Sequence, residues 1–228
     1  MTINFHNTHF EISASKLQEC PGASVPEIVF VGRSNAGKST AINTLCQQRQ
    51  LAYASKMPGR TQLLNFFTVI QKGETIARLV DLPGYGFAKL AESSKSIWDK
   101  ELGNYLSERP SLRGCVMIVD SRRGLLEMDH GLLNWVGHRS LPVHIVLSKS
   151  DKLSNQEKSQ ALRDAQAATK AYRDYGQPIT IQLWSALKKS GMTEFEKRLT
   201  QWIHPEEESA EPEANPQAAS ENNAPPTS

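Results

Sequence analysis

The sequence has no apolar run long enough to cross a membrane. A membrane-spanning helix needs about 20 consecutive apolar residues, and no stretch of the 228 residues approaches that length. The segment from Met1 to Lys16 is polar and lacks the apolar centre of a signal peptide. These absences argue against membrane insertion and secretion, so we expect a cytoplasmic protein.

Cysteine is also scarce, and the histidines are scattered. The three cysteines, Cys20, Cys46 and Cys115, are odd in number and widely spaced, and the six histidines form no pair that suggests a zinc site. A disulfide framework and a cysteine-based metal centre are therefore excluded as organising features. We expect the cysteines to be reduced thiols, as in cytoplasmic proteins.

The segment from Pro205 to Ser228 contains no lysine or arginine. It holds six of the 24 acidic residues, so the rest of the chain carries 26 basic and 18 acidic side chains and a net charge of +8. Its richness in Pro, Ala, Asn, Ser and Glu predicts a disordered tail. The tail either keeps the protein soluble or screens a basic surface from non-specific RNA. A basic body is compatible with an anionic partner but does not establish one.

Eight residues carry the most specific signal in the chain. The run Gly-Arg-Ser-Asn-Ala-Gly-Lys-Ser, from Gly32 to Ser39, fits the phosphate-binding pattern G-x-x-x-x-G-K-[ST]. The apolar run 27–31 before it predicts a strand, and 39–46 predicts the opening of a helix. Glycines at both ends let backbone N–H groups point at a phosphate chain, and the helix N-terminus adds partial positive charge.

Within this loop, Lys38 would reach the β- and γ-phosphates and the Ser39 hydroxyl would ligate Mg²⁺. The residues expected to contribute to the nucleotide site are Gly32, Arg33, Ser34, Asn35, Ala36, Gly37, Lys38, Ser39 and Thr40. By itself the loop indicates a nucleotide without identifying its base.

The remaining chain alternates strands with helices. Strands are expected at 27–31, 63–70, 75–80, 114–120, 143–147 and 179–183, and helices at 39–46, 93–108, 126–138, 154–174 and 190–202. This order predicts an α/β fold whose ligand lies at the carboxyl ends of the strands. We expect one domain at 25–204, an N-terminal extension at 1–24 and the tail at 205–228.

A second motif, Asp81-Leu-Pro-Gly84, follows a predicted strand and fits D-x-x-G. Asp81 can hold the Mg²⁺ shell through water, and the Gly84 N–H can reach a γ-phosphate. Leu82 and Pro83 complete this part of the expected site. Alone the sequence is an ordinary turn, but its position one hairpin after the phosphate loop favours nucleotide binding.

Two further motifs point to the base. Ser148, Lys149, Ser150 and Asp151 fit [NT]-K-x-D with serine in the first place, and Trp184, Ser185 and Ala186 end the next strand. The Asp151 carboxylate can accept from the adjacent N1–H and N2–H₂ of guanine, whereas adenine would leave it unpaired. The Lys149 stem can lie along the base, and the Ala186 N–H can approach guanine O6.

The stretch Pro58-Gly59-Arg60-Thr61 lies in a polar region before the second strand. Thr61 could complete the Mg²⁺ shell only when a γ-phosphate is present, which would order the loop in one nucleotide state. Gly59 joins the expected binding site. Arg60 has two interpretations, an arginine finger acting in cis or a surface contact, for example with RNA.

These five elements, in this order, resemble the translation-factor-related GTPases and, within them, the EngB (YihA/YsxC) family of ribosome-biogenesis GTPases in the TrmE-Era-EngA-EngB-septin-like group. The resemblance spans about residues 8–203 and rests on 31–39, 58–62, 65–67, 81–88, 148–151 and 184–186. Its most specific piece is Asp-Leu-Pro-Gly-Tyr-Gly-Phe-Ala, because generic GTPases share only the Asp and Gly. Ser148 departs from the threonine usual in the family but keeps the hydroxyl.

The resemblance implies a three-layer P-loop GTPase fold, a Ras-like G domain with a mostly parallel six-stranded sheet and helices on both faces. It also implies GTP or GDP and Mg²⁺ as ligands, with the metal held by Ser39, Thr61 and, through water, Asp81. The expected reaction is hydrolysis of GTP to GDP and phosphate, in which positioning and charge neutralisation matter more than a strong base.

Hydrolysis is expected to be slow. The residue after Gly84, where a Ras-type GTPase carries glutamine, is Tyr85, and a phenol cannot orient attacking water as a carboxamide does. Asn35 resembles the asparagine that helps to bind K⁺ in some related GTPases. We assign catalysis to Lys38, Thr61 and Asn35, and expect a switch that K⁺ or a ribosomal partner activates.

The resemblance further implies a monomer that acts on a ribosomal subunit, the large one, and its rRNA, in a role needed for growth and division. Candidate RNA contacts are Arg122, Arg123, Lys188 and Lys189, although most such charges simply face solvent. Neither a membrane nor DNA is expected as a partner. Two alternatives stay open: a signalling switch acting on protein effectors, disfavoured by the lack of a lipidation motif, and a self-sufficient NTP hydrolase, disfavoured by Tyr85.

Overall fold

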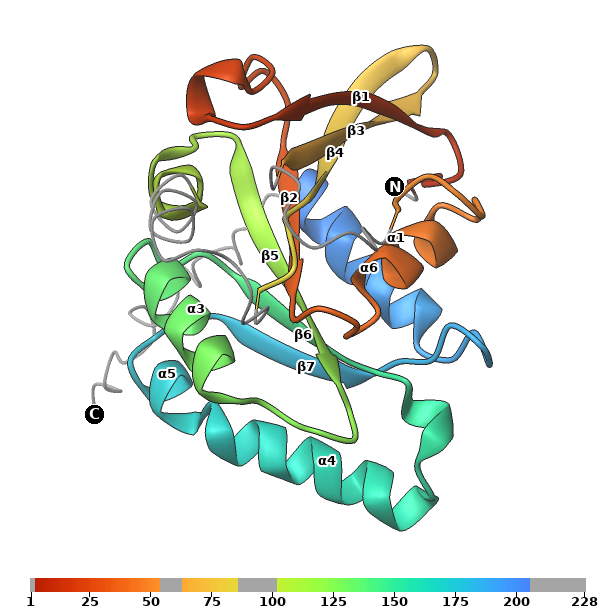
Figure 1. Ribbon diagram of the computed structural model, residues 1–228, viewed down its shortest axis with the longest axis vertical. Helices are drawn as coiled ribbons and strands as arrows, with labels where there is room; N and C mark the ends of the chain where they lie inside the picture. The colour runs from red at the N-terminus through yellow and green to blue at the C-terminus, as the bar shows by residue number, and fades with distance from the viewer. Residues whose placement is uncertain (1–2, 54–62, 86–101, 206–228) are drawn as a thin grey trace, which may run out of the picture.

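A seven-stranded sheet is the framework of the protein (Figure 1), in a computed structural model that describes residues 3–53, 63–85 and 102–205. The strands are β1 (Thr8–Ala14), β2 (Glu27–Gly32), β3 (Leu64–Gln71), β4 (Glu74–Asp81), β5 (Leu112–Asp120), β6 (Val143–Ser148) and β7 (Ile179–Leu183). Their spatial order is β1-β3-β4-β2-β5-β6-β7. Strands β1, β3 and β4 pair antiparallel, and the pairs from β4 through β2, β5 and β6 to β7 are parallel.

Helices cover both faces of this sheet, as Figure 1 shows. They are α1 (Lys38–Leu45), α3 (Glu127–Gly137), α4 (Asn155–Ala168), α5 (Lys170–Asp174) and α6 (Met192–Ile203), and residues 102–108 are also helical. Helices α1 and α6 lie on one face, and α3, α4 and α5 lie on the other. The expected three-layer α/β architecture is confirmed.

The central strands are buried on both faces, which explains their continuous apolar sequences. Successive residues of β2 point to opposite sides of the sheet. Val29 and Val31 belong to the core shared with α3, whereas Ile28 and Phe30 pack in the core formed with α1 and α6. Helices on both sides therefore fix β2, and with it the start of the phosphate loop.

The sheet has seven strands rather than the six expected. The additional strand is β1, within the segment 1–24 that the sequence analysis treated as an extension outside the domain. Most of β1 is exposed at the sheet edge and its sequence is largely polar, so it lacks the apolar pattern of the inner strands. Glu11 nevertheless pairs with Arg78 of β4 at 2.7 Å, and Phe5, just before β1, is buried in the core.

One helix also differs from the sequence prediction. The segment predicted as a single helix over 154–174 is divided into α4 and α5 at Thr169. The buried Thr169 hydroxyl donates to the Ala165 carbonyl at 2.8 Å. A side-chain bond to the carbonyl four residues earlier bends helices, which accounts for the break.

A buried ion pair fixes the amino end of β2. The Glu27 carboxylate is fully buried and accepts from the Arg109 guanidinium at 2.5 Å and 2.9 Å and from the Tyr105 hydroxyl at 2.9 Å. Because this carboxylate is fully hydrogen-bonded, its burial is compensated. The network joins β2 to the helical residues 102–108.

Two cysteines are inert by position. Cys46 and Cys115 are fully buried, and burial raises the pKa of the Cys46 thiol to about 12. Such thiols are protonated at neutral pH and react poorly.

None of the helices in the described ranges is long and apolar enough to span a bilayer.

Candidate nucleotide-binding site

The phosphate loop joins the end of β2 to the start of α1. It approaches the neighbouring strand so closely that a Cβ at Gly32 would lie 2.7 Å from the Ile118 carbonyl oxygen. Gly37, which precedes α1, has a φ of 106° that favours glycine. Both glycines of the motif are thus required by the backbone path, and the first turn of α1 directs its free N–H groups to the loop interior.

The base motif at the end of β6 holds this loop from the side. The buried Ser148 hydroxyl lies 2.5 Å from the Ala36 carbonyl and 3.1 Å from the Val119 carbonyl. The Lys149 ammonium donates to the Asn35 carbonyl at 2.7 Å. We expected the Lys149 stem to lie along the base; the structure also assigns its charged end to the phosphate loop.

Asp151 lies beside the motif that ends β7. Its carboxylate accepts from the Ser185 hydroxyl at 2.5 Å, and the Ser150 amide donates to the Trp184 carbonyl at 3.2 Å. The hydrogen bond from Ser185 lowers the pKa of the Asp151 carboxyl, which keeps it an acceptor at neutral pH. The structure therefore brings Asp151, Ser185 and the adjoining Ala186 together at the edge where β6 and β7 end.

Asp81 at the end of β4 lies against the phosphate loop. Its carboxylate forms an ion pair with the Lys38 ammonium, and both side chains are nearly buried. Burial raises the pKa of the Asp81 carboxyl, while Lys38 opposes that shift. A carboxylate and the Ser39 hydroxyl are hard oxygen donors that suit Mg²⁺, which usually takes one or two carboxylates plus phosphate oxygens. Gly59, Arg60 and Thr61 lie outside the described residues.

Gly84 comes close to the phosphate loop, where a side chain would crowd the backbone. A Cβ at Gly84 would lie 3.2 Å from the Ser34 amide nitrogen, and that amide donates to the Tyr85 carbonyl at 3.0 Å. The segment expected to meet a γ-phosphate thus lies directly beside the phosphate loop.

The Tyr85 side chain is buried in the core, which its position in the sequence did not indicate. It is 9% exposed and packs in the core, where its hydroxyl donates to Asp129 of α3 at 2.6 Å. The other Asp129 oxygen accepts from the Leu126 amide at 2.8 Å, at the start of α3. Burial and the Asp129 carboxylate raise the pKa of Tyr85. The phenol therefore anchors the chain to α3.

The sequence analysis missed Asp120, the last residue of β5. Its carboxylate lies 2.7 Å from the Arg122 guanidinium and 3.0 Å from the Lys149 ammonium. Arg122, a candidate RNA contact from its sequence position, is thus held in an ion pair. A cavity of about 240 Å³ beside the phosphate loop is lined by Arg33, Ser34, Asn35, Ala36, Ile118, Val119, Asp120, Arg122, Arg123, Gly124 and Lys149.

Comparison with known families gives a consistent result. A family model described as 50S ribosome-binding GTPase (MMR_HSR1) matches residues 27–149. The probable GTP-binding protein EngB of Burkholderia cenocepacia strain HI2424 is 44% identical over 218 residues, covering 94% of this chain and 100% of that protein. Its counterpart in Burkholderia thailandensis is 44% identical over 207 residues, or 90% and 94% of the two chains.

Solved structures show the same fold. The crystal structure of a probable GTP-binding protein engB has a TM-score of 0.54 and 19% identity, covering 79% of this chain and 99% of that one. Era in complex with MgGDPNP and nucleotides 1506–1542 of 16S ribosomal RNA has a TM-score of 0.60 and 22% identity, covering 78% and 56%. At these identities the likeness concerns the fold alone.

Replacing Tyr85 with phenylalanine tests its anchoring role. Loss of the hydroxyl leaves the buried Asp129 carboxylate without one of its donors, so the free energy of unfolding should fall by about 1–3 kcal/mol. Urea denaturation measures this change. The matched control is Tyr175→Phe, because Tyr175 is 93% exposed and its change should stay within about 0.5 kcal/mol. Equal stability of the two variants would contradict the anchoring role.

Proposed function

Because the chain belongs to the EngB family of P-loop GTPases, we propose that it is a guanine-nucleotide switch that acts in assembly of the large ribosomal subunit. The observation that carries the nucleotide-binding part of this proposal is that three distant motifs meet along one edge of the sheet. The Lys38 ammonium of the phosphate loop pairs with Asp81, and Lys149, from the same motif as Asp151, donates to the loop at Asn35. The ribosomal assignment draws on the family model, whose description is a 50S ribosome-binding GTPase.

Guanine selectivity is assigned to the end of β6. An ionised Asp151 offers two acceptor oxygens, which match the adjacent N1–H and N2–H₂ donors of guanine. Ser185 fixes the orientation of this carboxylate through its 2.5 Å hydrogen bond. Ala186, the next residue, has a backbone N–H suited to guanine O6, and Lys149 flanks the base.

Phosphate recognition is assigned to the loop and its neighbours. Bound Mg²⁺ supplies charge neutralisation at the β- and γ-phosphates, and Ser39, Thr61 and, through water, Asp81 would hold it. Lys38 turns its ammonium from Asp81 to the phosphates, and Gly84 offers its N–H to the γ-phosphate. Asn35, exposed at the crest of the loop, would contribute to a K⁺ site.

The GTPase is slow in this proposal because the described part of the site offers no side chain that orients the attacking water. Tyr85 stands where glutamine would act, and its hydroxyl is engaged with Asp129 at 2.6 Å. A positioned charge, from K⁺ or a ribosomal partner, would then control the rate. Such an enzyme works as a timed switch.

Single-turnover hydrolysis of GTP by the isolated protein tests this rate assignment. We expect less than about one turnover per second without a partner, and faster hydrolysis in K⁺ than in Na⁺ at equal ionic strength. Equal rates in the two salts would contradict the role of Asn35 in a K⁺ site. A faster partner-free reaction would contradict the switch.

Replacing Asp151 with asparagine tests base selection. The amide loses one acceptor, so GTP affinity should fall about 10- to 150-fold, whereas xanthosine triphosphate, which carries a carbonyl in place of the guanine amine, should bind better than to the wild type. Fluorescent nucleotide titration measures both affinities. Asp174→Asn is the control, because that carboxylate is 57% exposed on α5. Unchanged GTP affinity in Asp151→Asn would refute the assignment.

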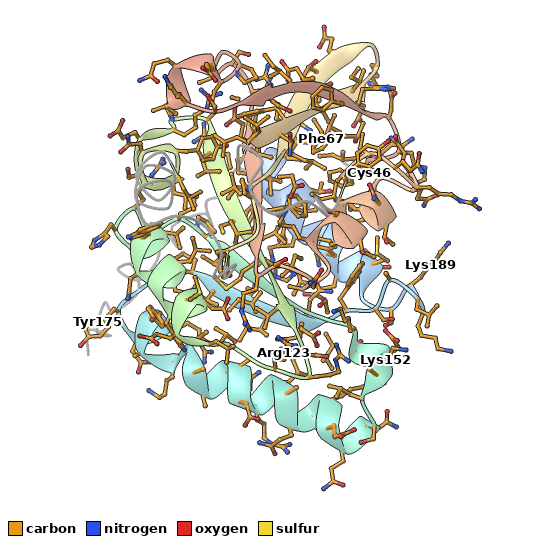
Figure 2. The ribbon with its side chains drawn as sticks, in the orientation of Figure 1. Cys46, Phe67, Arg123, Lys152, Tyr175 and Lys189 are labelled. Carbon is orange, nitrogen blue, oxygen red and sulfur yellow. The ribbon has the colours of Figure 1, made fainter. Side chains whose placement is uncertain are left out.

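An RNA-binding surface is proposed around the same edge of the sheet. Arg123, Lys188 and Lys189 are exposed beside the nucleotide-binding segments, and Figure 2 shows Lys152 and Lys189 at the side of the molecule where β6 and β7 end. Cations placed this way attract a phosphate backbone with salt-sensitive affinity. The net charge of +8 outside the acidic tail favours the same partner, and a monomer in the cytoplasm suits the role.

Sedimentation with purified ribosomal subunits tests the ribosomal assignment. The protein should co-migrate with the large subunit in one nucleotide state, under either GDP or a non-hydrolysable GTP analogue, and this association should weaken with rising salt. Substituting both Lys188 and Lys189 with glutamine should weaken it further. Co-migration with neither subunit in either nucleotide state would contradict the assignment, and co-migration with the small subunit alone would redirect it.

A further inference from the structure

Asp120 lies at the junction of two segments that meet the phosphate loop. It is the last residue of β5 and is 8% exposed. One carboxylate oxygen accepts from the Arg122 backbone amide at 3.1 Å and from its Nε at 2.9 Å. The other accepts from the Arg122 Nη2 at 2.7 Å and from the Lys149 ammonium at 3.0 Å. A single nearly buried carboxylate thus has two cationic partners: Arg122, in the segment after β5, and Lys149, at the end of β6.

Lys149 carries this connection to the phosphate loop. Its ammonium also donates to the Asn35 carbonyl at 2.7 Å, so it bridges the end of β5 and the crest of the loop. Both Lys149, with a φ of 59°, and Asn35, with a φ of 62°, adopt the left-handed backbone region. Non-glycine residues keep that conformation only where their surroundings enforce it.

We propose that Asp120 is a positioning residue for guanine nucleotide binding, which acts by holding Lys149 across the phosphate loop. With the ammonium fixed, the Asn35 carbonyl keeps its hydrogen bond to Lys149, and the backbone that leads from Asn35 to the start of α1 is held in place. The inference rests on the nucleotide site proposed above and concerns how that site is preorganised.

The charge state of Asp120 suits this role. The hydrogen bond from Arg122 is the main cause that holds the pKa of the Asp120 carboxyl well below its usual range, and Lys149 adds to the effect. The carboxylate is therefore ionised at neutral pH. A charged acceptor in a nearly buried position forms stronger hydrogen bonds to an ammonium than a neutral one does.

Arg122 offers the rival explanation for any effect at Asp120. Its guanidinium makes two hydrogen bonds to the same carboxylate, and this pair could act by ordering the segment between β5 and α3. The Arg122 side chain is 47% exposed. Loss of Arg122 would break that segment's ion pair but leave the contact between Asp120 and Lys149 in place.

Two charge-removing substitutions separate these explanations. Asp120→Asn keeps the shape of the side chain but weakens its hold on Lys149, whereas Arg122→Gln removes only the other partner. Dissociation of fluorescently labelled GDP and of a labelled non-hydrolysable GTP analogue is followed by stopped flow at fixed Mg²⁺. Thermal unfolding without nucleotide reports on the fold of each variant.

We expect Asp120→Asn to release both nucleotides about tenfold faster, as for loss of one hydrogen bond to a charged group. The ratio of the two rates should be unchanged, because Lys149 contacts the loop at Asn35 and not the segment Asp81–Gly84 that is assigned to the γ-phosphate. Arg122→Gln should stay within about twofold of the wild type. Lys149→Met should accelerate release as well, and combining it with Asp120→Asn should add little, since both act through one contact.

Three outcomes would overturn the proposal. These are unchanged dissociation in Asp120→Asn, an equal acceleration in Arg122→Gln, and full additivity in the double variant. Faster release accompanied by an unfolding midpoint close to that of the wild type supports positioning over a general loss of fold. A different result would contradict the ribosomal assignment alone: the protein would bind GDP but would sediment with neither ribosomal subunit.

Discussion

The attachment of the phosphate loop to the ends of β5 and β6 is the interaction on which the rest of the site depends. A loop of eight mostly polar residues has no core of its own and must take its shape from its neighbours. Ser148 and Lys149 hydrogen-bond to the Ala36 and Asn35 carbonyls, and Gly32 lies against Ile118. The segment at the end of β6 therefore also shapes the phosphate loop, so the two parts of the proposed nucleotide site belong to one connected structure.

Much of this arrangement could be predicted from the sequence because it follows from strand direction. Apolar runs such as 114–120 and 143–147 predict strands that are buried on both faces of the sheet. Parallel strands bring their carboxyl ends to one edge of that sheet. The motifs that begin at Asp81, Ser148 and Trp184 stand at the carboxyl ends of β4, β6 and β7. Their proximity therefore follows from the topology of the sheet.

The contacts that could not be predicted are those between single polar residues far apart in the chain. Tyr85 and Asp129 are 44 residues apart, and Asp120 and Lys149 are 29 apart. Such pairs leave no periodic pattern, because their partners are chosen by packing. The edge strand β1 was not predicted for a related reason. Most of its side chains are exposed, so its sequence lacks the continuous apolar run that marks the inner strands.

The shape of β1 has a consequence for how the protein behaves in a crowded solution. The outer strand of a sheet presents unpaired N–H and C=O groups that invite another chain to add a strand, which is a route to aggregation. Along β1 the pairing register shifts between Phe10 and Ile12, and such an irregularity interrupts a continuous ladder. At the opposite margin, β7 has only five residues. Both margins of the sheet are thus poor templates for strand addition, although Phe10 is exposed on one of them.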